Sequence, residues 1–174
     1  MIFPIKPIIT GSSSPITIPG LNPNTSYDVY VRNNCSASNY SSNSTVLQIT
    51  TPCLAITTLP YNQGFDNVGV IPSCWSTGLV AGTTNWITDV ADGDGVFTPH
   101  TGAGMAVKNW DGVASDALLI SPPFNLTALP APVTRLSVWI YRNTNGVNGD
   151  RVRFFVNAAP NLTGAVNLID VRTL

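Results

Sequence analysis

The sequence contains no glutamate, only two lysines and two glutamines, and few charges of either sign. Charged residues make up 10% of the 174 residues, and eight basic side chains against nine acidic ones give a net charge of -1. We expect no nucleic-acid partner, because no basic field is available to contact phosphate groups. Straight-chain helix formers are scarce, which argues against an ordinary mixed α/β enzyme.

Long apolar runs are also missing from the sequence. None approaches the roughly 20 residues of a membrane-spanning helix, so we expect no membrane span. The apolar start is interrupted by Pro4, Lys6 and Pro7, which is not typical of a signal peptide. The abundant residues are Thr, Ser and Asn, with 19, 14 and 17 copies, and they favour strands and turns. This composition predicts an all-β protein and is typical of a secreted or cell-surface bacterial module.

Three short antiparallel strands are expected in the first part of the chain. Apolar and polar side chains alternate at residues 14–19, at residues 27–32 and again around residues 47–49. A polar loop, residues 33–44, separates the second strand from the third. Ile16 and Ile18 share one face of the first run, and Tyr27, Val29 and Val31 share one face of the second. In the third run Leu47 and Ile49 are predicted to face inward.

The first turn and the second strand carry a recurrent pattern, made of Leu21, Pro23, Thr25, Tyr27, Val29, Val31 and Arg32. It resembles the corner between strands E and F of the fibronectin type III domain, where a tyrosine hydrogen-bonds back to the turn. Tyr27 takes that place. The resemblance covers residues 11–51 and implies a partial, immunoglobulin-like sandwich, strands E to G, over residues 1–52.

A second pattern follows a short linker, residues 53–62. Its most specific pieces are Pro-Ser-Cys-Trp at residues 72–75 and Leu-Ile-Ser-Pro-Pro-Phe-Asn-Leu at residues 119–126. They resemble the MAM-like, or cleaved-adhesin, jelly roll of type IX-secreted bacterial surface proteins and of gingipain adhesin regions. The resemblance implies a jelly-roll β-sandwich over residues 63–174 that is incomplete at its C-terminal side. Further residues of the pattern are Tyr61, Phe65, Asp66, Trp86 and Trp139.

Residues 133–156 are predicted to form a long antiparallel hairpin that turns at residues 143–149. Its aliphatic face consists of Leu136, Val138, Ile140, Val152, Phe154 and Val156. The opposite face carries Trp139, Tyr141, Arg151, Arg153 and Phe155. Aromatic rings beside guanidinium groups suit the binding of glycans or glycoproteins, because rings stack on sugar faces and guanidinium groups donate to hydroxyls. The alternative is that a second sheet or a domain contact covers this face.

Three cysteines allow one internal disulfide. Cys35 and Cys53 fall at opposite ends of a strand of 6 to 7 residues, about 20 Å apart, which is too far for a bridge. Cys53 and Cys74 both lie in the opening loops of the second domain, and we expect them to pair. Cys35 is then free or paired outside these strands.

Closely spaced aspartates precede residue 96. Asp89, Asp92 and Asp94 are closely spaced, and glycines at positions 93 and 95 let a loop curl around a hard cation, which favours calcium. Asp66 is a further candidate ligand by analogy with an acidic residue of related modules. Gingipain adhesin modules carry a similar run after their first tryptophan, whereas here it follows Trp86. Aspartate and glycine are also common turn residues, so a plain turn is the alternative.

Catalysis is not expected from this chain. The single histidine, His100, lies in a loop and is predicted to be a solvated side chain. No Gly-x-Ser-x-Gly motif accompanies it, and paired-carboxylate hydrolysis would need aspartates alone. Both domains are expected to lack strands, so the chain is either part of a longer polypeptide or exchanges strands with its copies.

The sequence therefore predicts a non-catalytic extracellular adhesion or interaction module of a larger secreted or cell-surface protein. One alternative is an accessory carbohydrate-binding or spacer region of a secreted peptidase or glycosidase. Another is a strand-exchanging subunit of an extracellular filament.

Overall fold

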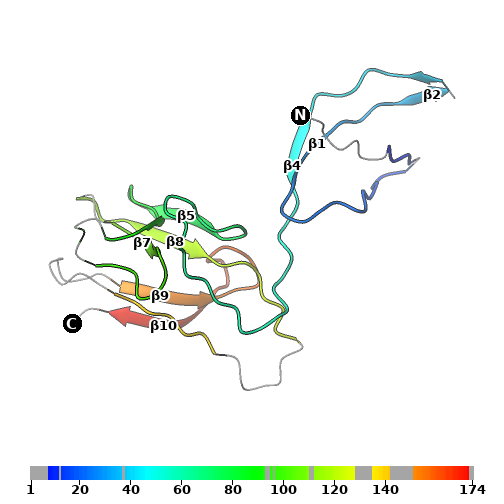
Figure 1. Cartoon of the computed structure of the whole chain (residues 1–174). Coiled ribbons are helices and arrows are strands. Elements are labelled where there is room, and N and C mark those ends of the chain that lie inside the picture. Colours follow the sequence, from blue (N-terminus) through cyan, green and yellow to red (C-terminus); the bar gives the residue numbers. More distant parts are fainter. Residues whose placement is uncertain are drawn as a thin grey trace. The chain divides into compact units, whose positions relative to one another are not determined.

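The structure of the chain is a computed structural model that describes residues 8–11, 13–36, 38–92, 95, 97–109, 112–127, 135–141 and 151–172. These residues contain no helix, and their strands pair antiparallel in two-stranded sheets (Figure 1). The all-β class predicted from the composition is confirmed. Within the same residues no helix is long and apolar enough to cross a bilayer.

The chain divides into two compact units. Unit 1 comprises Met1–Ile56 and Pro122–Phe124, and unit 2 comprises Thr57–Ser121 and Asn125–Leu174. The division after Ile56 falls inside the segment that the sequence suggests as a linker, residues 53–62. Within unit 1, Ile56 and Phe124 form an isolated β-bridge.

The sheet of unit 1 pairs β1 (Ser26–Val29) with β4 (Leu47–Thr50), and Tyr27 lies opposite Ile49. Tyr27, Val29 and Ile49 are half-buried, as their alternation with polar neighbours predicts. Leu47 lies opposite half-buried Val29 and therefore points to the same face, but it is 62% exposed. Val31, beyond the end of β1, is 67% exposed. A two-stranded sheet this short cannot cover the side chains at its ends.

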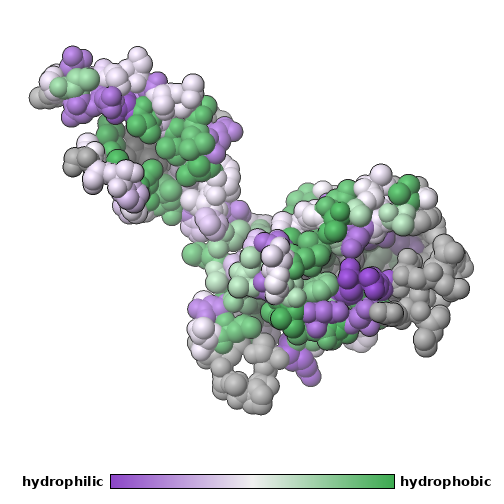
Figure 2. All heavy atoms as spheres, turned by 180° about the vertical axis from the view of Figure 1, so that it is seen from behind, coloured by the Kyte–Doolittle hydropathy of each residue, from purple (hydrophilic) through white to green (hydrophobic). Residues whose placement is uncertain are grey.

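Unit 1 leaves many apolar side chains in contact with solvent. Ile16, Ile18, Val31 and Leu47 are all exposed, and Figure 2 shows hydrophobic side chains gathered over one face of this unit. A β layer normally buries such a face against a second layer. The described residues of unit 1 provide no second layer.

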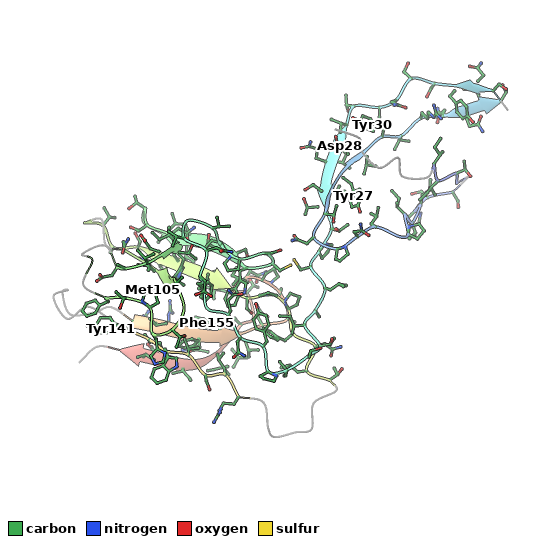
Figure 3. The ribbon with its side chains drawn as sticks, viewed as in Figure 1. Tyr27, Asp28, Tyr30, Met105, Tyr141 and Phe155 are labelled. Carbon is green, nitrogen blue, oxygen red and sulfur yellow. The ribbon has the colours of Figure 1, made fainter. Side chains whose placement is uncertain are left out.

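The turn before β1 is held by side chains from both of its ends. The backbone amide of Asn22 donates to the Tyr27 hydroxyl at 2.8 Å, which is the backward hydrogen bond expected of this tyrosine (Figure 3). The Thr51 hydroxyl donates to the Asn22 carbonyl at 2.5 Å and accepts from the Thr25 amide at 3.0 Å. Asn24 adopts a positive φ of 46°, a conformation that asparagine tolerates in turns. The hydrogen bond predicted for Tyr27 is therefore confirmed.

Replacing Tyr27 with phenylalanine is expected to lower the free energy of unfolding of unit 1 by about 1 kcal/mol, because the Asn22 amide loses its acceptor. Urea titration measures the loss, and faster hydrogen exchange of the Asn22 amide locates it. The matched control is Tyr30→Phe, since Tyr30 is 51% exposed and makes no hydrogen bond within the described residues. Equal effects of the two substitutions would contradict a specific role of the Tyr27 hydroxyl.

Two expectations for unit 1 are wrong. Residues 14–19 form no strand, because Pro15 and Pro19 remove two amide donors from a run of six residues. The expected polar loop instead contains a small hairpin of β2 (Asn34–Ser36) and β3 (Asn39–Tyr40). Both strands are exposed on both faces, so they lack the apolar alternation by which strands are detected.

The described residues of unit 2 contain three two-stranded sheets, of which Figure 1 shows the β9–β10 pair clearly. Their strands are β5 (Ser76–Ala81) with β8 (Asp116–Ile120), β6 (Ile87–Asp89) with β7 (Met105–Val107), and β9 (Arg151–Val156) with β10 (Val166–Arg172). Val107 on β7 and Thr88 on β6 are buried. The Thr88 hydroxyl donates to the Asn67 carbonyl at 2.8 Å and accepts from the Val70 amide at 3.0 Å. This residue therefore fixes the loop before β5.

Aromatic residues of the second sequence pattern meet in unit 2. The Phe65 and Trp75 rings pack edge to face, with centroids 4.8 Å apart. The Trp75 indole N–H donates to the Tyr61 hydroxyl at 3.0 Å, and that hydroxyl lies 3.0 Å from Gln63 Oε1. Trp86 donates its indole N–H to the carbonyl of Ala117 on β8, at 3.1 Å. These tryptophans are therefore structural residues.

The hairpin predicted over residues 133–156 is wrong in its pairing. Residues 135–141 form no strand, and β9 pairs with the downstream β10. The connection between them is closed by Asn157, whose side-chain amide donates to the carbonyls of Asn161 and Thr163 at 2.7 and 2.9 Å. Gly164 turns the chain with a φ of 74°. These contacts bring β10 back alongside β9.

Cys53 and Cys74 form a disulfide, as predicted, whereas Cys35 on β2 is a free, exposed thiol. Disulfides persist in oxidising compartments, so this bond is compatible with an extracellular protein.

Candidate functional site

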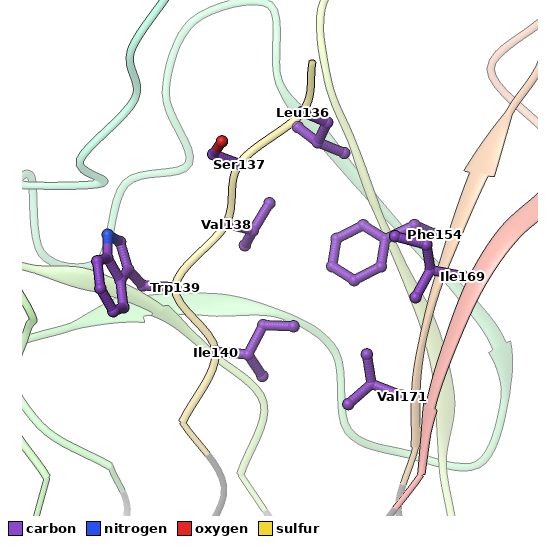
Figure 4. A pocket seen from close by; sticks show the side chains of 8 residues that line it. All are labelled: Leu136, Ser137, Val138, Trp139, Ile140, Phe154, Ile169 and Val171. Carbon is purple, nitrogen blue, oxygen red and sulfur yellow. The ribbon is translucent and has the colours of Figure 1, made fainter.

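The candidate site is built on residues 135–141 of unit 2, which we call the outer segment. All seven residues are exposed, and their side chains alternate in direction. Figure 4 shows Leu136, Val138 and Ile140 pointing toward β9 and β10, while Trp139 points away. The faces predicted for this segment are therefore present, although the segment is not in a sheet.

An apolar hollow of about 430 Å³ separates the outer segment from the β9–β10 sheet. On the sheet side it is lined by Phe154, Ile169 and Val171, and on the other side by residues 136–140 (Figure 4). Ile169 is 55% exposed and Val171 is 40% exposed, so the hollow is open to solvent. The two walls are thus close enough to form one groove but leave their apolar side chains partly uncovered.

Two aromatic stacks support the outward side chains of the outer segment. The Trp139 ring lies on His100, with centroids 3.9 Å apart and planes 12° apart. The Tyr141 ring lies on Phe97, with centroids 3.6 Å apart and planes 28° apart. We call these four residues the aromatic platform. Trp139 is 79% exposed and Tyr141 is 59% exposed, so one ring of each stack presents a free surface to solvent.

Arg151 and Arg153, predicted to share the ligand-binding face, instead pair with carboxylates. Arg153 donates to Asp116 Oδ2 on β8 at 3.2 Å, and Arg151 lies 3.8 Å from Asp170 Oδ2 on β10. Arg153 also lies 5.3 Å from the centre of the Phe155 ring. Among the described residues no ring contact joins either arginine to the aromatic platform. Their guanidinium groups therefore connect strands of unit 2.

The candidate calcium ligands are engaged in turns. Asp92 Oδ1 accepts from the Phe97 amide at 3.1 Å, and Asp89 Oδ1 accepts from the Val90 amide at 2.7 Å. Asp94 lies outside the described residues. Within the described part of the chain, no three Asp, Glu, His or Cys side chains form a group that could hold a metal ion. The described contacts match the plain-turn alternative, and a calcium site stays a prediction.

Asp66 differs from Asp89 and Asp92 in its hydrogen bond, which joins it to a distant loop. Its Oδ1 accepts from the Ala103 amide at 2.7 Å. Gly102 has a φ of 79°, and a Cβ atom at this position would collide with Asp66 Oδ1. A Cβ atom on Gly104 would lie 2.5 Å from the Phe65 carbonyl oxygen. The glycines around Ala103 therefore let this loop approach the Asp66 carboxylate.

Sequence reasoning missed Phe97 and His100 as members of the platform. His100 is exposed, as expected for a loop residue, but it is not simply solvated because it stacks on Trp139. Its contact joins residues far apart in the sequence, which local patterns do not report. The local sequence offers one signal: Phe97 and His100 lie close together in a loop, and Pro99 between them disfavours a helix.

No family model matches the chain, and no curated protein or solved structure matches it either.

Proposed function

We propose that the chain is a non-catalytic extracellular adhesion module of a larger secreted or cell-surface bacterial protein, and that it binds glycans or glycoproteins. The observation that carries this proposal is the aromatic platform. A tryptophan and a tyrosine, two residues apart, each present an exposed ring that a second ring supports from behind. Pyranose rings stack on such surfaces through their apolar C–H faces.

The architecture proposed for the two units supports the same function. Unit 1 combines the antiparallel β1–β4 pair with the Tyr27 hydrogen bond, which agrees with part of a fibronectin type III sandwich. In unit 2 the contact between Phe65 and Trp75 gives structural roles to residues of the MAM-like pattern. Both kinds of domain serve as binding or spacing modules, so an accessory region of a secreted peptidase or glycosidase would use the same surface.

His100 also fits a binding role better than a catalytic one. Its ring is stacked on Trp139, and within the described residues it makes no hydrogen bond to a serine, cysteine or aspartate. A histidine that activates a nucleophile needs such a hydrogen bond. The geometry therefore uses the imidazole as a support for the indole.

Replacing Trp139 with alanine is expected to weaken binding to a glycan at least about tenfold, because exposed tryptophans at the centre of an interface carry much of its binding energy. Binding of the whole chain to a glycan array identifies the sugar, and calorimetry with that sugar measures the loss. His100→Ala should weaken binding less, because it removes only the supporting ring. Tyr30→Ala, an exposed tyrosine of unit 1, is the control. No glycan bound by the whole chain, or equal losses at Tyr30 and Trp139, would contradict the proposal.

A further inference from the structure

The outer segment, residues 135–141, is not paired with another strand among the described residues. Its side chains alternate in direction (Figure 4), and within the described residues none of its backbone groups makes a hydrogen bond. Unpaired amide and carbonyl groups of an extended segment bind another strand. All seven residues are exposed, so such a strand has access to them.

The composition of the segment favours pairing with an identical copy. Residues 136–141 contain no charge, no proline and no glycine, and four of the six are β-branched or aromatic. Short segments of this kind pair readily with their own copies. An antiparallel pair of identical segments is related by a two-fold axis, so pairing through one edge of the segment joins two chains.

The faces of the segment restrict the register of such a pair. Residues opposite one another in antiparallel strands point to the same face, so Leu136, Val138 and Ile140 must lie opposite one another. Placing Val138 opposite its copy pairs all seven residues, with Leu136 opposite Ile140 and Arg135 opposite Tyr141. A parallel pair in register would instead place Arg135 opposite Arg135, and like charges directly opposite are destabilising.

We propose that two copies of the chain associate by antiparallel pairing of residues 135–141, with Val138 of each copy at the two-fold axis. The paired segments extend the apolar wall of the hollow across both copies, which covers the exposed Leu136, Val138 and Ile140 from the side. Trp139 and Tyr141 of both copies point to the opposite face. This association does not depend on the glycan-binding proposal.

Sedimentation of the whole chain from about 1 µM to about 1 mM is expected to show a reversible equilibrium between one and two copies, because an interface this small binds weakly. Cross-linking then tests the register. Cys35 is a free thiol and is first replaced by serine. In that background Val138→Cys should form a disulfide between copies at least tenfold faster than Leu136→Cys, although Leu136 is more exposed.

The difference follows from the spacing along the strands. The two cysteines at position 138 lie directly opposite, whereas those at position 136 are separated by four residues, or about 13 Å. A disulfide requires Cα atoms within about 7 Å. A chain that stays single at every concentration would overturn the proposal. Equal cross-linking rates, or faster cross-linking at position 136, would overturn the register, and with it the pairing as proposed.

Discussion

Replacing both Cys53 and Cys74 with serine is expected to lower the free energy of unfolding by about 3 kcal/mol. The disulfide closes a loop of about 20 residues, and opening it restores the conformational entropy of that loop in the unfolded chain. Few side chains are buried among the described residues, so this link is expected to contribute strongly to stability. Urea titration of the oxidised protein and of the double variant measures the difference.

The matched control is Cys35→Ser. Cys35 is exposed and free, so its replacement should change the free energy of unfolding by less than about 0.5 kcal/mol. Reduction of the unaltered protein should lower its stability as much as the double substitution does. A double variant as stable as the Cys35→Ser variant would show that the Cys53–Cys74 bond contributes nothing to folding.

Truncation of Trp75 is expected to cost about 3 kcal/mol or more. Trp75→Ala removes the half-buried ring that packs against Phe65 and the donor to the Tyr61 hydroxyl. Trp75→Phe keeps an aromatic ring and should lose less, mainly the hydrogen bond. Thermal unfolding followed by circular dichroism measures both variants.

Trp139→Ala is the control for this effect. Trp139 is a residue of the same type and the same unit, but it is 79% exposed, so its truncation should change stability by less than about 1 kcal/mol. The two tryptophans thus separate stability from binding. A loss on Trp139→Ala as large as that on Trp75→Ala would mean that the platform belongs to the folded core.

Local patterns predicted the strands whose two faces differ. Tyr27 and Val29 are half-buried while Asp28 is exposed, so β1 could be recognised from its alternation. The strands β2 and β3 were missed because both are exposed along their whole length and too short to show an alternation of apolar and polar residues. The pairing of Cys53 with Cys74 was predicted because both were expected in the opening loops of the second domain, while Cys35 and Cys53 would lie a full strand apart.

Contacts between distant segments could not be predicted in the same way. The alternation of Leu136, Val138 and Ile140 correctly indicated one apolar side, but alternation carries no information on which strand lies alongside. β9 pairs with β10, and Asn157 holds the connection between them, residues 157–165. For the same reason Trp139 and Tyr141 could be singled out, whereas their supports Phe97 and His100 could not.

The close approach of Gly102 to Asp66 has a consequence for how this loop can change in evolution. Any side chain at position 102 would displace the carboxylate that accepts the Ala103 amide. The φ of 79° at position 102 would strain a residue with a Cβ atom even beside a smaller residue 66, so position 102 should stay glycine among descendants of this chain.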